Sequence, residues 1–144
     1  MKQTIRLTLI SVAVSLFATA LHAQTGPYSF FAITPCRAVD TRGTSPVGQG
    51  QQRNFAIRGV CGVPTTAAAV SINVTVVSPT TASFLTVWPT GGSRPNVSTI
   101  NFTGSDQSLA NGAIVGLGTP PADLAVFNAS GTVHVLIDVT GYFQ

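Results

Sequence analysis

Two long segments alternate apolar and polar residues with a period of two, and this pattern does most to limit the fold. The apolar positions are Val70, Ile72, Val74 and Val76 in residues 69–77, and Val133, Val135, Ile137 and Val139 in residues 133–140. Successive side chains of a β-strand point to opposite faces, so each set shares one face. We therefore predict two long strands whose eight apolar side chains lie in the core, because a one-residue slip would expose a whole set.

Shorter segments of β character surround these two and are bounded by Gly, Pro, Ser or Asn. They cover residues 28–33, 53–57, 84–88, 98–102, 113–117 and 124–128. Short β segments separated by turn residues are typical of antiparallel sandwiches and barrels. The sequence therefore predicts an all-β protein, an antiparallel β-sandwich of immunoglobulin-like or jelly-roll-like type, with seven to nine strands.

The N-terminal residues have the composition of an export signal. Lys2 and Arg6 precede an apolar stretch, residues 7–20, which is too short for a stable membrane span. Cleavage fits after Ala20 or after Ala23, and an uncleaved anchor is the alternative. We expect a signal peptide over residues 1–23 and a single β-sandwich domain over residues 24–144. The expected location is secreted, extracellular or at the cell surface, with the periplasm also possible, and without membrane contact after cleavage.

Cys36 and Cys61 are the only cysteines of the chain. In an exported protein an isolated pair is most simply a disulfide, and closing this loop would contribute about 3 kcal/mol on the loop-entropy model. The alternative, a zinc site, needs four ligands, and the only His after residue 23 is His134. We predict a structural disulfide, no metal site and no cofactor.

Charged residues are scarce beyond the export segment. Residues 24–144 contain five Arg and four Asp, a formal net charge of +1, with no Lys or Glu. This balance argues against nucleic acid as a partner and removes most general acid–base reagents. His134 and Asp138, with Ser71 or Ser130, are the best catalytic candidates, but four strand residues span about 13 Å. We therefore predict no catalytic residue and no enzymatic activity.

Asp138 interrupts an apolar strand between Ile137 and Val139. A carboxylate that is half buried there needs a partner, and without Lys the partner must be Arg or backbone amides. We predict that Asp138 belongs to a structural polar network with Arg37, Asp40 and Arg42.

Trp88 stands at the end of a predicted strand, where the chain enters a Pro- and Gly-rich loop. A flat aromatic ring in such a place can stack against a sugar ring, and Tyr28 and Tyr142 are candidates to flank it. The residues predicted to bind a ligand are Trp88, Thr90, Arg94 and Asn96. The alternative is that Trp88 seals the end of the core.

Five short motifs follow one another along the chain. They are TPCR at 34–37, VDTR at 39–42, CGVP at 61–64, FLTVWP at 84–89 and DVTGYF at 138–143. Together they resemble a secreted β-rich module of actinobacterial and acidobacterial exported proteins, which occurs alone or appended to cell-surface proteins and hydrolases. The resemblance implies a β fold and export, and it brings no activity and no catalytic residue.

These observations favour a secreted, non-catalytic cell-surface module with a role in adhesion. Its expected partner is a neutral glycan such as cell-wall or extracellular polysaccharide, because the net charge is too small to hold an anionic polymer. The alternative is a structural subunit that associates with its own copies, through strand edges, into a surface layer or fibre.

Overall fold

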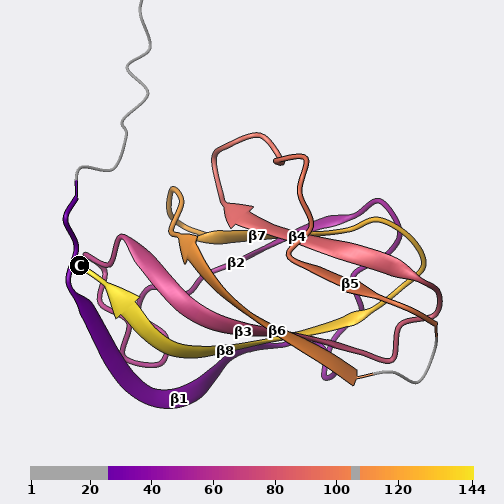
Figure 1. Cartoon of the computed structure of the whole chain (residues 1–144), viewed down its shortest axis with the longest axis horizontal. Coiled ribbons are helices and arrows are strands. Elements are labelled where there is room, and N and C mark those ends of the chain that lie inside the picture. Colours follow the sequence, from indigo (N-terminus) through magenta and orange to yellow (C-terminus); the bar gives the residue numbers. More distant parts are fainter. Residues whose placement is uncertain (1–25, 105–107) are drawn as a thin grey trace, which may run out of the picture.

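The computed structural model describes residues 26–104 and 108–144, which form eight strands and no helix (Figure 1). The strands are β1 (Phe30–Asp40), β2 (Gln52–Phe55), β3 (Ala69–Val77), β4 (Ser83–Pro89), β5 (Ile100–Phe102), β6 (Ser108–Gly116), β7 (Leu124–Asn128) and β8 (His134–Phe143). The predicted all-β class and strand number are confirmed. The predicted signal peptide, residues 1–23, lies outside the described residues.

The strands form two antiparallel sheets of four. The first sheet has the order β1-β8-β3-β6 and the second has the order β2-β7-β4-β5. The pairs β1–β8, β2–β7, β3–β6 and β4–β5 are the ones that a single long hairpin would make if its turn lay between β4 and β5. Rolling that hairpin up adds the pairs β8–β3 and β7–β4. This is jelly-roll connectivity, which distinguishes between the two predicted kinds of sandwich.

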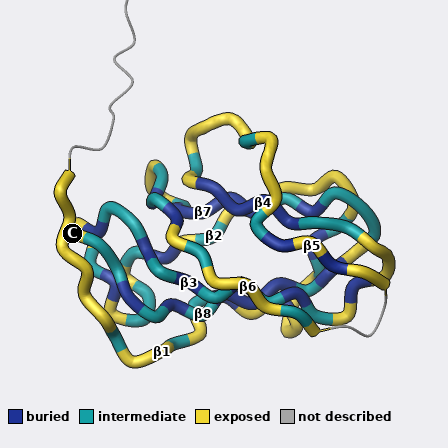
Figure 2. The backbone as a smooth tube through the Cα atoms, in the orientation of Figure 1, coloured by how far each residue is buried: buried dark blue, intermediate teal, exposed yellow. Residues whose placement is uncertain are grey.

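The core lies between the inner faces of the two sheets (Figure 2). All eight apolar side chains predicted for β3 and β8 are at most 2% exposed, which confirms both the strands and their faces. From the second sheet, alternate residues of β4 and β7 enter the same core: Leu85, Val87, Leu124 and Val126. Alternate side chains of both sheets therefore meet in one core. On the outer face of the second sheet, Thr86, Trp88 and Ala125 are buried as well.

Two strands extend far beyond their predicted segments. β1 continues from the predicted segment through Cys36 to Asp40, and β6 begins at Ser108 rather than at residue 113. In β6 the sequence Ala110–Gly112 has the composition of a turn. It is a strand because all nine residues of β3 find partners in β6, and pairing of this extent overrides weak local preference.

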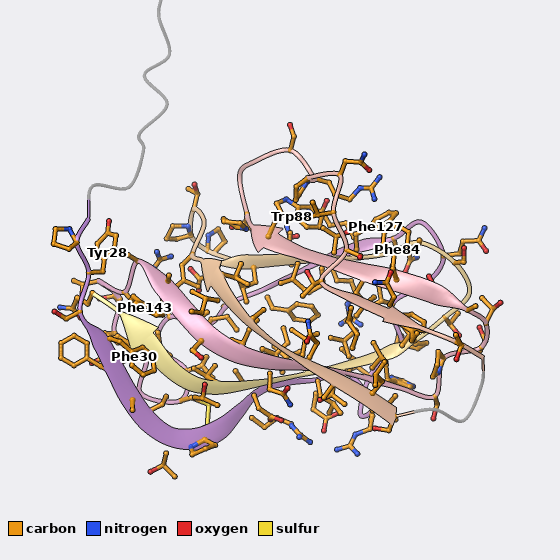
Figure 3. All side chains as sticks on the ribbon, viewed as in Figure 1. Tyr28, Phe30, Phe84, Trp88, Phe127 and Phe143 are labelled. Carbon is orange, nitrogen blue, oxygen red and sulfur yellow. A yellow bond between two sulfur atoms is a disulfide. The ribbon has the colours of Figure 1, made fainter. Side chains whose placement is uncertain are left out.

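The first and last described segments close against each other. Ser29 and Gln144 exchange backbone hydrogen bonds of 2.8 and 3.1 Å, and the Phe30 and Phe143 rings lie 5.0 Å apart. A Cβ atom on Gly141 would lie 2.4 Å from the Phe30 ring, so only glycine fits there. Tyr28, Phe30 and Phe143 thus gather at one end of the first sheet (Figure 3).

Candidate ligand-binding site

Trp88 lies on the outer side of the second sheet but is covered by the chain that follows it. The residue is 4% exposed, and its indole Nε1 donates a hydrogen bond of 3.2 Å to the Gly92 carbonyl. The prediction that Trp88 presents an open face to a ligand is therefore wrong. Its ring seals a loop against the sheet, and Tyr28 lies away from it, at one end of the molecule (Figure 3).

Thr90 also has a structural place rather than an open one. Its hydroxyl donates to the carbonyls of Ala122 and Thr119, and its N–H donates to the Asp123 carbonyl at 3.1 Å. These bonds join the loop after β4 to the loop before β7. Thr90 is thus engaged within the fold.

Arg94 and Asn96, in contrast, line one hollow on the outer face of the second sheet. Its volume is about 250 Å³, and its other lining residues are Phe84, Val97, Ser98 and Asn101. Phe84 belongs to β4 and Asn101 to β5, which pair with each other in register. The loop between β4 and β5 returns over this face because the Thr86 hydroxyl donates to the Val97 carbonyl at 2.7 Å.

Arg94 is held by an aromatic ring instead of a carboxylate. Its Cζ atom lies 4.0 Å from the centre of the Phe127 ring, which itself lies 6.4 Å from the Phe84 ring. Phe84, Phe127 and Trp88 occupy the same region of the second sheet (Figure 3). A guanidinium over a ring is fixed in orientation while its N–H groups stay available.

The polar groups of this hollow differ in how far the fold uses them. Within residues 26–104 and 108–144, the side chains of Arg94 and Asn96 make no hydrogen bond to the protein, and both residues are exposed. The Asn101 amide donates to the Ser98 hydroxyl at 3.0 Å, which leaves its carbonyl oxygen as an acceptor. The hollow therefore offers donors, an acceptor and a phenyl ring to one small ligand.

The sequence argument missed Phe84, Phe127 and Asn101. A usable signal was present, because Leu85 and Val126 face the core and their neighbours Phe84 and Phe127 must then face outward. The sequence prediction considered only Trp and Tyr as rings that stack on a sugar, so it left out these two phenylalanines.

The four residues of the predicted polar network do lie together. Arg37 makes two hydrogen bonds to the Asp138 carboxylate, at 2.7 and 2.9 Å, from the neighbouring strand β1. Arg42 contacts Asp40 in the same way, with its Nη2 atom 2.6 Å from the carboxylate, and Arg37 lies 3.8 Å from Asp40. The hydrogen bonds from Arg42 lower the pKa of Asp40 to about 2, and those from Arg37 lower the pKa of Asp138.

The predicted disulfide between Cys36 and Cys61 is confirmed. It joins β1 to the loop between β2 and β3 and closes a segment of sequence separation 25. Restricting the unfolded chain in this way contributes about 3 kcal/mol on the loop-entropy model.

The catalytic candidates have separate partners. His134 Nδ1 lies 3.0 Å from the Thr41 carbonyl oxygen, whereas Asp138 contacts Arg37. Ser71 is hydrogen-bonded to Thr140 at 2.9 Å. Within the described ranges no three side chains of His, Cys, Asp or Glu type are grouped to hold a metal ion.

One polar centre was not predicted at all. Asp123 is 3% exposed, accepts hydrogen bonds from the N–H groups of Ile57 and Arg58 at 2.7 and 2.8 Å, and forms an ion pair with the Arg58 guanidinium. Arg58 also donates to the carbonyls of Ala67 and Gly118, at 3.0 and 2.9 Å. These contacts hold together the loops at one end of the sandwich.

Comparison of the chain with protein-family models, curated proteins and solved structures found no match. In the described part of the chain, no helix has the length and apolar character needed to cross a membrane.

Proposed function

We propose that this protein is a secreted, non-catalytic module of the cell surface that binds a neutral glycan in the hollow beside Phe84. One observation carries the proposal: a phenyl ring lies next to a guanidinium and an amide that the described fold leaves without hydrogen-bond partners. The hollow takes over the role that the sequence assigned to Trp88, and it keeps two of the four predicted residues, Arg94 and Asn96.

The chemistry of a sugar suits these groups. Its C–H face packs on a phenyl ring such as Phe84, while its hydroxyls accept from Arg94 and exchange hydrogen bonds with Asn96 and Asn101. A volume of about 250 Å³ suits one unit of a polysaccharide that continues across the surface. The near-zero net charge predicts that binding depends only weakly on salt.

Export to an oxidising compartment supports the same proposal. The Cys36–Cys61 disulfide persists where thiols are not kept reduced, and the residues before Gln24 have the pattern of a signal peptide. The resemblance of the five motifs to exported β-rich modules is in keeping with this location.

The test is retention of the exported protein on immobilised cell-wall polysaccharide. Arg94→Gln and Asn96→Ala alter exposed side chains and should each weaken retention by roughly tenfold, with unchanged thermal unfolding. Phe84→Ala removes a half-buried ring and should also weaken retention, and Phe31→Ala is its control, since Phe31 is an accessible phenyl ring that lies on β1. Wild-type retention of Arg94→Gln and Asn96→Ala would refute the hollow as the binding site.

The alternative expectation from the sequence, a subunit that associates with its own copies, depends on the strand edges instead of this hollow. We favour glycan binding because the hollow presents polar groups that have no hydrogen-bond partner among the described residues and that a ligand can satisfy.

A further inference from the structure

The four edge strands of the sandwich differ in how well they are protected against pairing. β2 and β5 are edges of only 4 and 3 residues. β1 has 11 residues, but it contains two irregularities in register, Pro35, and the charged residues Arg37 and Asp40. Short length, bulges, proline and charge are the usual devices that keep an edge from accepting another strand.

β6 has none of these devices. Its 9 residues, Ser108–Gly116, include no proline and no charge, and they pair with β3 without any irregularity. Among the described strands β3 is its only partner in the sheet. The opposite side of β6 is therefore a long and regular edge.

The alternation of the backbone shows which groups this edge presents. The Leu117 N–H, directly after β6, donates to the Ala68 carbonyl on the β3 side at 2.8 Å. Since neighbouring residues of a strand direct their N–H and C=O groups to opposite sides, those of Gly116, Ile114, Gly112 and Ala110 point away from β3. These groups form a row ready to pair with an added strand.

The side chains beside that row differ in size on the two sides of Gly112. Ile114 is 69% exposed, the highest value of any large apolar residue described, while Gly112 and Ala110 are small. Ile114 and Gly112 line an open hollow on the outer face of the first sheet, together with Ser71 and Thr140. A Cβ atom on Gly112 would meet no atom within 4 Å.

We propose that β6 pairs with β6 of a second copy of this chain, antiparallel and across a two-fold axis at Gly112. Gly112 then faces Gly112 of the second copy, and Ile114 faces Ala110 of the second copy, twice by symmetry. All of these residues direct their backbone groups into the new interface, so the two first sheets become one continuous sheet of eight strands.

The strand's own pattern favours a second copy over an unrelated peptide. With a two-fold axis at Gly112, each residue faces the residue of the second copy that lies equally far on the other side of Gly112. The exposed Ile114 therefore meets the small Ala110. The absence of charge on β6 means that no like charges oppose each other. Because the three other edges are protected, pairing stops at a closed dimer and does not continue into a fibre.

The test compares the mass of the exported protein in solution, by sedimentation velocity across a concentration series, with that of Gly112 variants. The wild type should form dimers. Gly112→Lys and Gly112→Glu each set like charges opposite one another at the axis and should weaken the dimer by roughly tenfold or more. An equimolar mixture of the two variants should restore it, because the opposed charges then attract.

Gly43→Lys is the matched control, since Gly43 has the same open surroundings as Gly112 but lies outside the strands; it should remain dimeric. Ile114→Asn is a second interface variant and should also weaken the dimer, which keeps the test valid if a Gly112 variant folds poorly. A wild type that is monomeric throughout, or Gly112 variants that dimerise separately, would overturn the proposal. A mixture that stays monomeric would refute the two-fold register. The proposed glycan-binding hollow lies on the second sheet, whereas β6 belongs to the first. Retention on polysaccharide can therefore fail or succeed independently of dimer formation.

Discussion

Two arginine–aspartate pairs connect distant parts of this chain, and they differ most in burial. Arg58 and Asp123 have side chains that are 15% and 4% exposed, whereas those of Arg37 and Asp138 are 42% and 23% exposed. The buried pair also holds two backbone N–H groups and two carbonyls, which belong to the β2–β3 and β6–β7 loops. The exposed pair links only two neighbouring strands, β1 and β8.

The difference shows that a similar contact has different consequences in different surroundings. In water, the attraction between exposed charges is small, because water solvates the separated charges almost as well. Inside the protein, a charge that loses its partner is left without solvation, so breaking the pair is costly even where forming it gains little. Substituting each aspartate in turn should therefore give different losses in the free energy of unfolding.

The largest effect is expected for Asp123→Asn. The substitution leaves the Arg58 guanidinium buried without a counter-charge. It also sets the new N–H₂ group against other donors, either that guanidinium or the N–H groups of Ile57 and Arg58. We expect the free energy of unfolding in urea to fall by about 3 to 5 kcal/mol, as for other broken buried pairs. A loss below about 1 kcal/mol, the range of surface pairs, would show that water reaches this carboxylate.

A smaller effect is expected for Asp138→Asn. Arg37 is nearly half exposed, so the bidentate contact with Asp138 is screened and we expect a loss of about 1 kcal/mol. The double variant with Arg37→Gln should be no less stable than Asp138→Asn, because the two residues act through one contact. A loss as large as that of Asp123→Asn would contradict the difference in burial.

The smallest effect is expected in how the free energy of unfolding falls at acidic pH. The hydrogen bonds from Arg37 lower the folded-state pKa of Asp138 below its usual 3.8, and those from Arg42 lower the pKa of Asp40 to about 2. Both depressed values mean that the folded state binds the proton less readily than the unfolded state. Their contribution is therefore complete above about pH 4 and is lost as the pH falls towards about 2.

Urea unfolding at several pH values between 6 and 2 measures this contribution. The unfolding free energy of the wild type should fall more steeply below pH 4 than that of Asp138→Asn, which lacks one of the titrating groups. Parallel curves for the two proteins would show that Asp138 has the same pKa in both states.

Sequence reasoning succeeded where one local pattern carried the information. The alternation in β3 and β8 predicted both strands and their inner faces, and an isolated cysteine pair predicted the disulfide. Asp138 was noticed because it interrupts an apolar strand. Asp123 was not, because it follows Pro120 and Pro121 in what has the composition of an ordinary turn. Its burial depends on Arg58, 65 residues away in the sequence, and no local pattern records that contact.

By itself, then, the sequence determined the class of fold, the core of the two long strands and the covalent link, since each follows from periodicity or residue type. Tertiary structure decided the strand order, the extension of β6 and which rings of the second sheet are covered. Trp88 is covered, whereas Phe84 is half-buried and lines the hollow, because the loop between β4 and β5 folds back over one and beside the other. That path depends on hydrogen bonds such as Thr86 to Val97, which exist only after the strands have paired.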